Sequence, residues 1–132
     1  MSTTVVACLL RNTEASAGDY NEVLIIQAEN DSFYYPQTFI KPDENPIDTA
    51  TRALFEASGL TSISWEKIGE DLAYICLISK TDIVLPDKWR VTIDNKMTEL
   101  VWAPIQQTNN LMEEQFFVKN LLLQWKSSGK TP

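Results

Sequence analysis

Residues 33–60, FYYPQTFIKPDENPIDTATRALFEASGL, contain the best-delimited element of the chain. Pro42 and Pro46 exclude both a helix interior and a central strand from the loop between them, since neither structure tolerates this proline spacing. Asn45 is a suitable N-cap residue, because its side chain accepts a hydrogen bond from the first helical turn. Pro46 suits the first helical position, where a backbone N–H is not needed. The sequence therefore predicts that a helix begins at Pro46.

The same helix has a clear end and an amphipathic pattern. Gly59 follows Ser58 and is typical of the residue that terminates a helix in the left-handed conformation. One face at helical spacing carries the apolar residues Ile47, Ala50, Leu54 and Ala57. We therefore expect a helix over Pro46–Ser58 that packs against a sheet through this face.

The segments on either side are rich in apolar and β-branched residues, which favours strands. Strong strands are predicted at Thr3–Leu10, Glu22–Ala28, Asp71–Ser79 and Glu99–Ile105, and weaker ones at Ile83–Leu85 and Arg90–Ile93. The first two are expected to pair antiparallel across a loop at Arg11–Asn21. A second amphipathic helix is predicted at Asn110–Trp125. This order of elements indicates an α+β fold with helices covering a mixed sheet.

Length and charge limit the classes of function. The 132 residues fit one domain, which we place at residues 1–132. A net charge of -7 argues against non-specific binding to nucleic acid or anionic membranes, because both depend on Lys and Arg neutralising phosphates. The N-terminus has no basic region before a long apolar stretch, so we expect a cytoplasmic protein.

The absence of histidine restricts the chemistry further. Without His, the chain has no Ser-His-Asp or Cys-His mechanism and no imidazole zinc site. Cys8 and Cys76 lie in apolar runs and are expected to be buried thiols. Any catalysis must therefore use carboxylates, Lys, Tyr or a hard cation held by oxygen ligands.

Residues 38–60 resemble the signature of the Nudix hydrolase family, G-x5-E-x7-R-E-U-x-E-E-x-G-U with U aliphatic. The alignment needs no gap, and the matching residues are Glu44, Arg52, Leu54, Glu56, Gly59 and Leu60. Thr38, Ala53 and Ala57 depart from the signature. The order of elements along the chain agrees with the family as well, which implies a Nudix-like α/β/α sandwich with a mixed sheet between helices.

The resemblance also implies a metal site, and it shows that this chain lacks some of the residues of that site. In the family, carboxylates at positions 53, 56 and 57 converge on one helix face and hold Mg²⁺ or Mn²⁺ against a diphosphate. Two of these three positions are alanine here, so metal attraction is weakened. Thr38 also adds a Cβ where the family has glycine.

The following candidate residues remain. The metal ligands would be Glu56 and Glu44, and the cofactor, if any, Mg²⁺ or Mn²⁺. Glu56, Arg52 and Glu99 are the candidate catalytic residues, with Glu99 as a base from outside the signature. From the aromatic cluster and the loop, Phe33, Tyr35 and Lys41 are the candidate substrate-binding residues. A charge ladder of Asp48, Arg52 and Glu56 on the helix surface would explain part of this pattern without any function.

Three functions stay open. The leading hypothesis is a divergent Nudix-fold protein that binds a nucleotide or another diphosphate-linked ligand, with weak or no pyrophosphohydrolase activity. The second is an active Mg²⁺-dependent nucleoside triphosphate pyrophosphohydrolase, because Mg²⁺ commonly uses only one or two protein carboxylates. The ELVWAPI strand and the terminal helix resemble the branch of the family acting on dATP-like or dihydroneopterin-like triphosphates. The third is a non-catalytic protein-interaction module on this scaffold, for example a homodimer.

Overall fold

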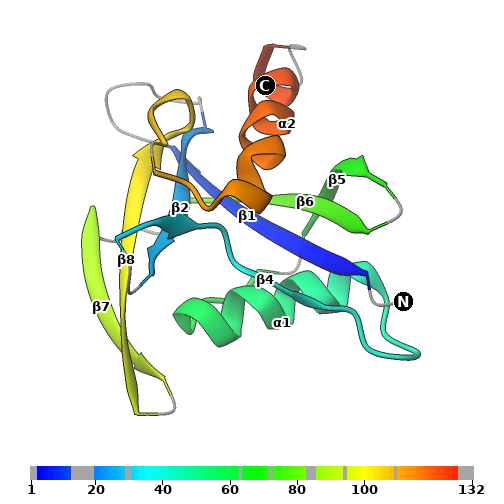
Figure 1. Cartoon of the computed structure of the whole chain (residues 1–132), viewed down its shortest axis with the longest axis horizontal. Helices are drawn as coiled ribbons and strands as arrows, with labels where there is room; N and C mark the ends of the chain where they lie inside the picture. The colour runs from blue at the N-terminus through cyan, green and yellow to red at the C-terminus, as the bar shows by residue number, and fades with distance from the viewer. Residues whose placement is uncertain are drawn as a thin grey trace.

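The computed structural model describes residues 3–12, 20–28, 31–62, 64–71, 73–82, 86–93, 95–108 and 110–127. The predicted strand at Ile83–Leu85 lies outside these ranges, as do most of the predicted loop at residues 11–21 and residues 128–132 of the tail. The described elements form one mixed sheet with a helix on each of its two faces (Figure 1).

Strand β1 (Thr4–Asn12) lies inside the sheet and is buried on both faces. It pairs antiparallel with β2 (Tyr20–Gln27), as predicted, and parallel with β6 (Tyr74–Thr81). A continuous apolar run such as VVACLL suits this position, because a strand with two covered faces has no reason to alternate with polar residues.

The sheet has the strand order β5-β6-β1-β2-β8-β7. Its outer strands are β5 (Glu66–Glu70) at one end and β7 (Lys88–Ile93) at the other, next to β8 (Lys96–Pro104). Two short strands pair elsewhere: β3 (Phe33–Tyr34) with the end of β2, and β4 (Gln37–Phe39) with the start of β1. The segment between β2 and α1 therefore contributes a strand to each of the two neighbouring strands.

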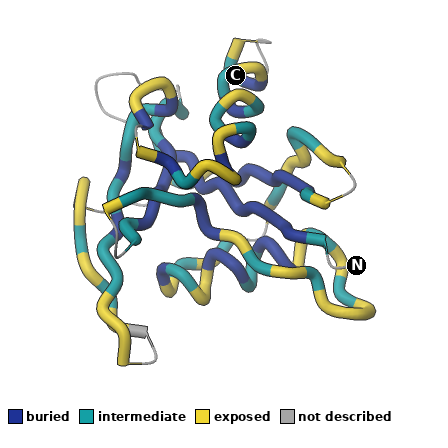
Figure 2. The backbone as a smooth tube through the Cα atoms, viewed as in Figure 1, coloured by how far each residue is buried: buried dark blue, intermediate teal, exposed yellow. Residues whose placement is uncertain are grey.

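The two helices cover opposite faces, which confirms the predicted α/β/α sandwich. Alternate residues of β1 separate into two core clusters, with Val5 and Ala7 on the side of α1 (Pro46–Ser58). Val6 and Cys8 lie on the side of α2 (Phe116–Ser127). Figure 2 shows the buried residues concentrated along the central strands, between the helices.

Two sequence predictions need correction. The second helix begins at Phe116, not at Asn110, because Asn110 has a positive φ of 59° and a 3-10 turn at Glu113–Gln115 precedes the helix. The segment EKIGE forms strand β5, which was not predicted, since its polar sequence hides a strand that exists only by pairing with β6.

Neither described helix is long and apolar enough to span a membrane.

Candidate functional site

Helix α1 has the bounds that its sequence predicts, because both ends are capped locally. Asn45 Oδ1 accepts a hydrogen bond of 2.9 Å from the backbone N–H of Asp48, and Pro46 occupies the first turn. At the other end Gly59 has φ of 77° and donates its N–H to Phe55 O at 2.8 Å. These caps fix where the charged side chains of the helix emerge.

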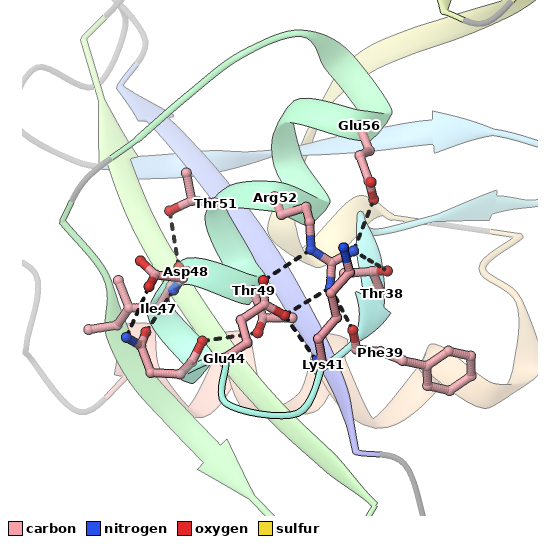
Figure 3. A network of polar contacts seen from close by, with 11 residues as sticks. Thr38, Phe39, Lys41, Glu44, Ile47, Asp48, Thr49, Thr51, Arg52 and Glu56 are labelled. Carbon is pink, nitrogen blue, oxygen red and sulfur yellow. Dashed lines mark hydrogen bonds and ion pairs between the residues drawn. The ribbon is translucent and has the colours of Figure 1, made fainter.

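Arg52 organises the polar network in front of this helix (Figure 3). Its Nε and Nη2 donate to the two carboxylate oxygens of Glu44 at 3.1 and 2.9 Å. Nη2 also donates to Phe39 O at 2.7 Å, and Nη1 donates to Thr38 Oγ1 at 3.3 Å and to Glu56 Oε1 at 3.4 Å. The five N–H groups of the guanidinium thus face five acceptors within the chain.

Glu44 is held in its ionised form by this network. The guanidinium of Arg52, followed by the backbone N–H of Lys41, lowers the pKa of Glu44 to about 2. The Lys41 N–H donates to Glu44 Oε1 at 3.0 Å, so Lys41 enters the site through its backbone, while the residue as a whole is exposed. Both carboxylate oxygens of Glu44 are therefore already engaged.

The surface charge ladder forms only in part. Arg52 reaches Glu56 one turn later, at 3.4 Å. Asp48 instead accepts a hydrogen bond of 3.0 Å from Asn45 Nδ2, at the helix cap. Arg52 is turned toward the loop and β4, so its main partner is Glu44 from the preceding loop.

The two alanines at the signature positions of α1 face the protein interior. Ala53 is only 2% exposed and packs with Val5 and Ala7 of β1. Ala57 is half-buried against the cluster that contains Leu54 and Leu100. The covered face of the helix is therefore apolar at both positions where the signature has glutamate.

A groove opens beside this network, across β2, β3 and β8. Its volume is about 1090 Å³, and its lining includes Gln27, Tyr34, Gln37, Met97, Glu99 and Met112. Glu99 pairs across the sheet with Gln27, and Gln37 immediately precedes Thr38 of the Arg52 network. The groove and the network therefore share the start of β4.

Glu99 lies in this groove as half of an ion pair. Lys88 Nζ lies 2.7 Å from Glu99 Oε1, without hydrogen-bond geometry, and Arg90 Nε lies 3.9 Å from Oε2. The side chain of Glu99 is 18% exposed, whereas that of Lys88 is 64% exposed. Glu99 is thus a partly buried carboxylate with an exposed counter-ion.

Solved structures of other proteins have a similar fold. No family model matches the sequence, and no curated protein matches it. The NUDIX domain of NrtR from Shewanella oneidensis, solved with ADP-ribose, is 18% identical with a TM-score of 0.66, over 92% of this chain and 86% of that one. The Nudix hydrolase RenU from M. smegmatis is 15% identical with a TM-score of 0.70, over 96% and 87%. MutT from Methanosarcina mazei is 17% identical with a TM-score of 0.65, over 98% and 95%.

The chain has the Nudix fold. The similarity concerns the fold, so the chemistry has to be argued from the side chains.

The residues at the Nudix signature positions do not fit a divalent cation. Of positions 53, 56 and 57, only Glu56 carries a carboxylate, and its side chain is 57% exposed and bound by Arg52. Both oxygens of Glu44 already accept hydrogen bonds from Arg52 and Lys41. Within the described ranges there is no cluster of three His, Cys, Asp or Glu side chains that could hold a metal ion. Mg²⁺ is commonly held by one or two protein carboxylates with water and phosphate oxygens, and of the three positions this helix supplies only Glu56, which is already paired with Arg52.

The candidate aromatic residues have separate places. Tyr35 is fully buried, its hydroxyl lies 3.4 Å from Thr108 Oγ1, and burial raises its pKa. Its ring has no surface left for a ligand, so we assign it to the core. Phe33 is half-buried against the α2 side of the core. Tyr34, between them, lines the groove.

The alternation of side chains along a strand is the sequence signal that could have identified Tyr34 as a residue lining the groove. Residues 33 and 35 point to one face of the sheet, and residue 34 therefore points to the other. No local sequence pattern indicates a role for Gln37 or Gln115. These residues are 78 positions apart in the chain, and Gln115 Nε2 lies 2.8 Å from Gln37 Oε1.

Proposed function

We propose that this Nudix-fold protein binds a nucleotide or another diphosphate-linked ligand and turns it over weakly or not at all. The observation that carries the proposal is the environment of Ala53 and Ala57. Both methyl groups are packed into the apolar interface between α1 and the sheet. The helix therefore lacks the carboxylates with which a hard cation would be held and a water oriented.

The groove supports ligand binding independently of catalysis. Its volume of about 1090 Å³ slightly exceeds the range of about 300–1000 Å³ that small-molecule sites span. It combines an aromatic ring and two thioethers with amides and one carboxylate, the usual mixture of apolar walls and a few orienting polar groups. A structurally similar NUDIX domain was solved with ADP-ribose, which motivates a nucleotide-containing ligand as the first probe.

The test measures binding and turnover on the same preparation. ADP-ribose, GDP, ADP and nucleoside triphosphates are titrated by calorimetry, and each is then incubated for hours with the protein and an excess of Mg²⁺ over the nucleotide. Products are separated by chromatography, with an active Nudix hydrolase as the positive control. We expect saturable binding of at least one compound and no product above the protein-free blank. Rapid hydrolysis, or the absence of binding by every compound, would refute the proposal.

A slow hydrolase is the second candidate, and Glu99 is the observation that favours it. Its carboxylate lies in the groove and has an exposed lysine as its counter-ion. In this version Glu99 would accept the proton of the attacking water, and Glu56 would be the one carboxylate of the signature helix face left to hold a cation. Glu99→Gln and Glu56→Gln would each abolish a measurable rate. If residual hydrolysis is found and neither variant changes it, the activity is a contaminant and the candidate is removed.

A further inference from the structure

We propose that the groove holds its ligand by the heterocyclic ring, through a hydrogen bond from Gln37 Nε2, and that the phosphates contribute little. This inference rests on the proposed function and names the part of the ligand that is recognised. The inference follows from the hydrogen bond by which the buried amide of Gln115 fixes the orientation of the exposed amide of Gln37.

The orientation of Gln115 is determined by the backbone of Tyr35. Gln115 is 1% exposed, and its Oε1 lies 2.7 Å from the Tyr35 nitrogen, which can only donate. Its Nε2 lies 3.0 Å from the Tyr35 carbonyl oxygen, which can only accept. The two contacts agree, so the amide of Gln115 has one permitted orientation.

Gln115 in turn fixes the orientation of Gln37. Gln115 Nε2 donates to the side chain of Gln37 at 2.8 Å, so the Gln37 atom at this contact must be its oxygen. The Nε2 group of Gln37 then points away from the contact. Gln37 is exposed and lines the groove. The groove therefore presents a hydrogen-bond donor whose polarity is set from the core.

The other groups in the groove suit a planar heterocycle. Tyr34 offers an aromatic ring and Met97 and Met112 offer polarisable thioethers, which contact the faces of flat rings favourably. Glu99 offers an acceptor for a ring N–H. A nucleobase has the flat faces, the acceptors and the donors that these groups require.

The Arg52 network offers the phosphates no anchor. The five N–H groups of Arg52 face acceptors within the chain, and the signature positions do not fit a cation. Lys96 lines the groove together with Glu99, whose carboxylate is paired with Lys88 and lies near Arg90. Phosphate binding needs unengaged cationic or N–H donors, which this network does not offer.

The test uses the four ribonucleosides and their 5′-diphosphates, titrated by calorimetry in EDTA. We expect at least one nucleoside to bind within about threefold of the affinity of its diphosphate. The decisive variant is Gln37→Glu, which keeps an acceptor for Gln115 Nε2 and replaces the donor in the groove by an acceptor. Because nucleosides are neutral, the added charge does not repel them. The variant should weaken nucleoside binding at least about tenfold.

The control and the outcomes separate this inference from the proposed function. Gln124→Glu adds the same charge at an exposed position of α2 and should leave nucleoside binding unchanged. Thermal unfolding of both variants confirms that the fold is intact. Diphosphates that bind while nucleosides do not would overturn the inference and leave the proposed function standing. Nucleoside binding unchanged in Gln37→Glu would also overturn it, and no binding of any probe would refute both.

Discussion

Arg52 shows how one residue can keep its place in a signature while its surroundings change. Its guanidinium joins a loop carboxylate, a strand carbonyl and a helix carboxylate, and Thr38 adds a hydroxyl acceptor. These contacts stabilise the junction between β4 and α1, which positions Gln37 at the edge of the groove. Arg52 and Glu44 therefore serve the structure of this site whether or not any reaction takes place there.

The ion pair of Glu44 predicts a pH dependence of stability. Its pKa is lowered from 4.5 to about 2 in the folded protein, so Glu44 contributes stability that is fully present above pH 4.5 and is lost as the pH falls toward 2. Glu44→Gln should therefore lose less stability than wild type between pH 7 and pH 3, measured by urea unfolding. Asp43→Asn, a change of the neighbouring exposed carboxylate, serves as the control. Equal losses in wild type and Glu44→Gln would contradict this role.

Restoring the glutamates of the signature should have unequal effects at the two positions. Ala53 is 2% exposed between α1 and β1, so Ala53→Glu brings an unpaired carboxylate into an apolar interface. We expect a loss of about 3 kcal/mol or more in the free energy of unfolding. Ala57 is half-buried, so Ala57→Glu should cost clearly less. Urea unfolding of the two single variants measures these losses. An Ala53→Glu variant as stable as wild type would show that the interface between α1 and β1 opens.

At the scale of elements, the sequence predicts what local chemistry determines. Helix α1 was predicted with its correct bounds because Asn45, Pro46 and Gly59 act within a few residues of the helix. Strand β5 was missed, and α2 was predicted to begin too early, because both depend on tertiary contacts. The groove could not be predicted either, since it requires β3 and β4 to pair with two different strands.

The caps of α1 give a quantitative prediction. Asn45→Ala removes the acceptor for the Asp48 N–H and should lower the free energy of unfolding by about 1 kcal/mol. Gly59→Ala places a Cβ on a residue with φ of 77° and should cost a similar amount, about 1 kcal/mol. Thr61→Ala, at an exposed position just beyond the helix, should have little effect. Chemical denaturation measures all three, and a cap variant that matches Thr61→Ala would argue against the capping geometry.

At the scale of the whole molecule, the helices cover the two faces of β1 and leave other parts of the sheet open. Helix α1 packs on one face of β1 and α2 on the other, while a groove opens across β2, β3 and β8. Solved structures of low identity share this fold, and the chemistry depends on which side chains the fold exposes.

The same burial predicts the behaviour of the two thiols. Cys8 and Cys76 are free and buried on neighbouring strands. Burial raises the pKa of Cys76 to about 12 and that of Cys8 well above its ordinary value, so almost no thiolate exists at pH 8. A chromogenic disulfide reagent should therefore react with neither thiol in the folded protein and with both in concentrated urea. Rapid reaction of one thiol without urea would mean that the sheet opens.

The most direct test of the account is calorimetry of Mg²⁺ and Mn²⁺ binding, with and without a non-hydrolysable nucleoside triphosphate, on wild type and on Glu56→Gln. The account predicts that neither metal binds specifically in either protein and that the nucleotide does not change this, because the signature positions retain only one exposed carboxylate. Metal binding that requires the nucleotide and disappears in Glu56→Gln would contradict it, and would show that a working metal site survives on this helix.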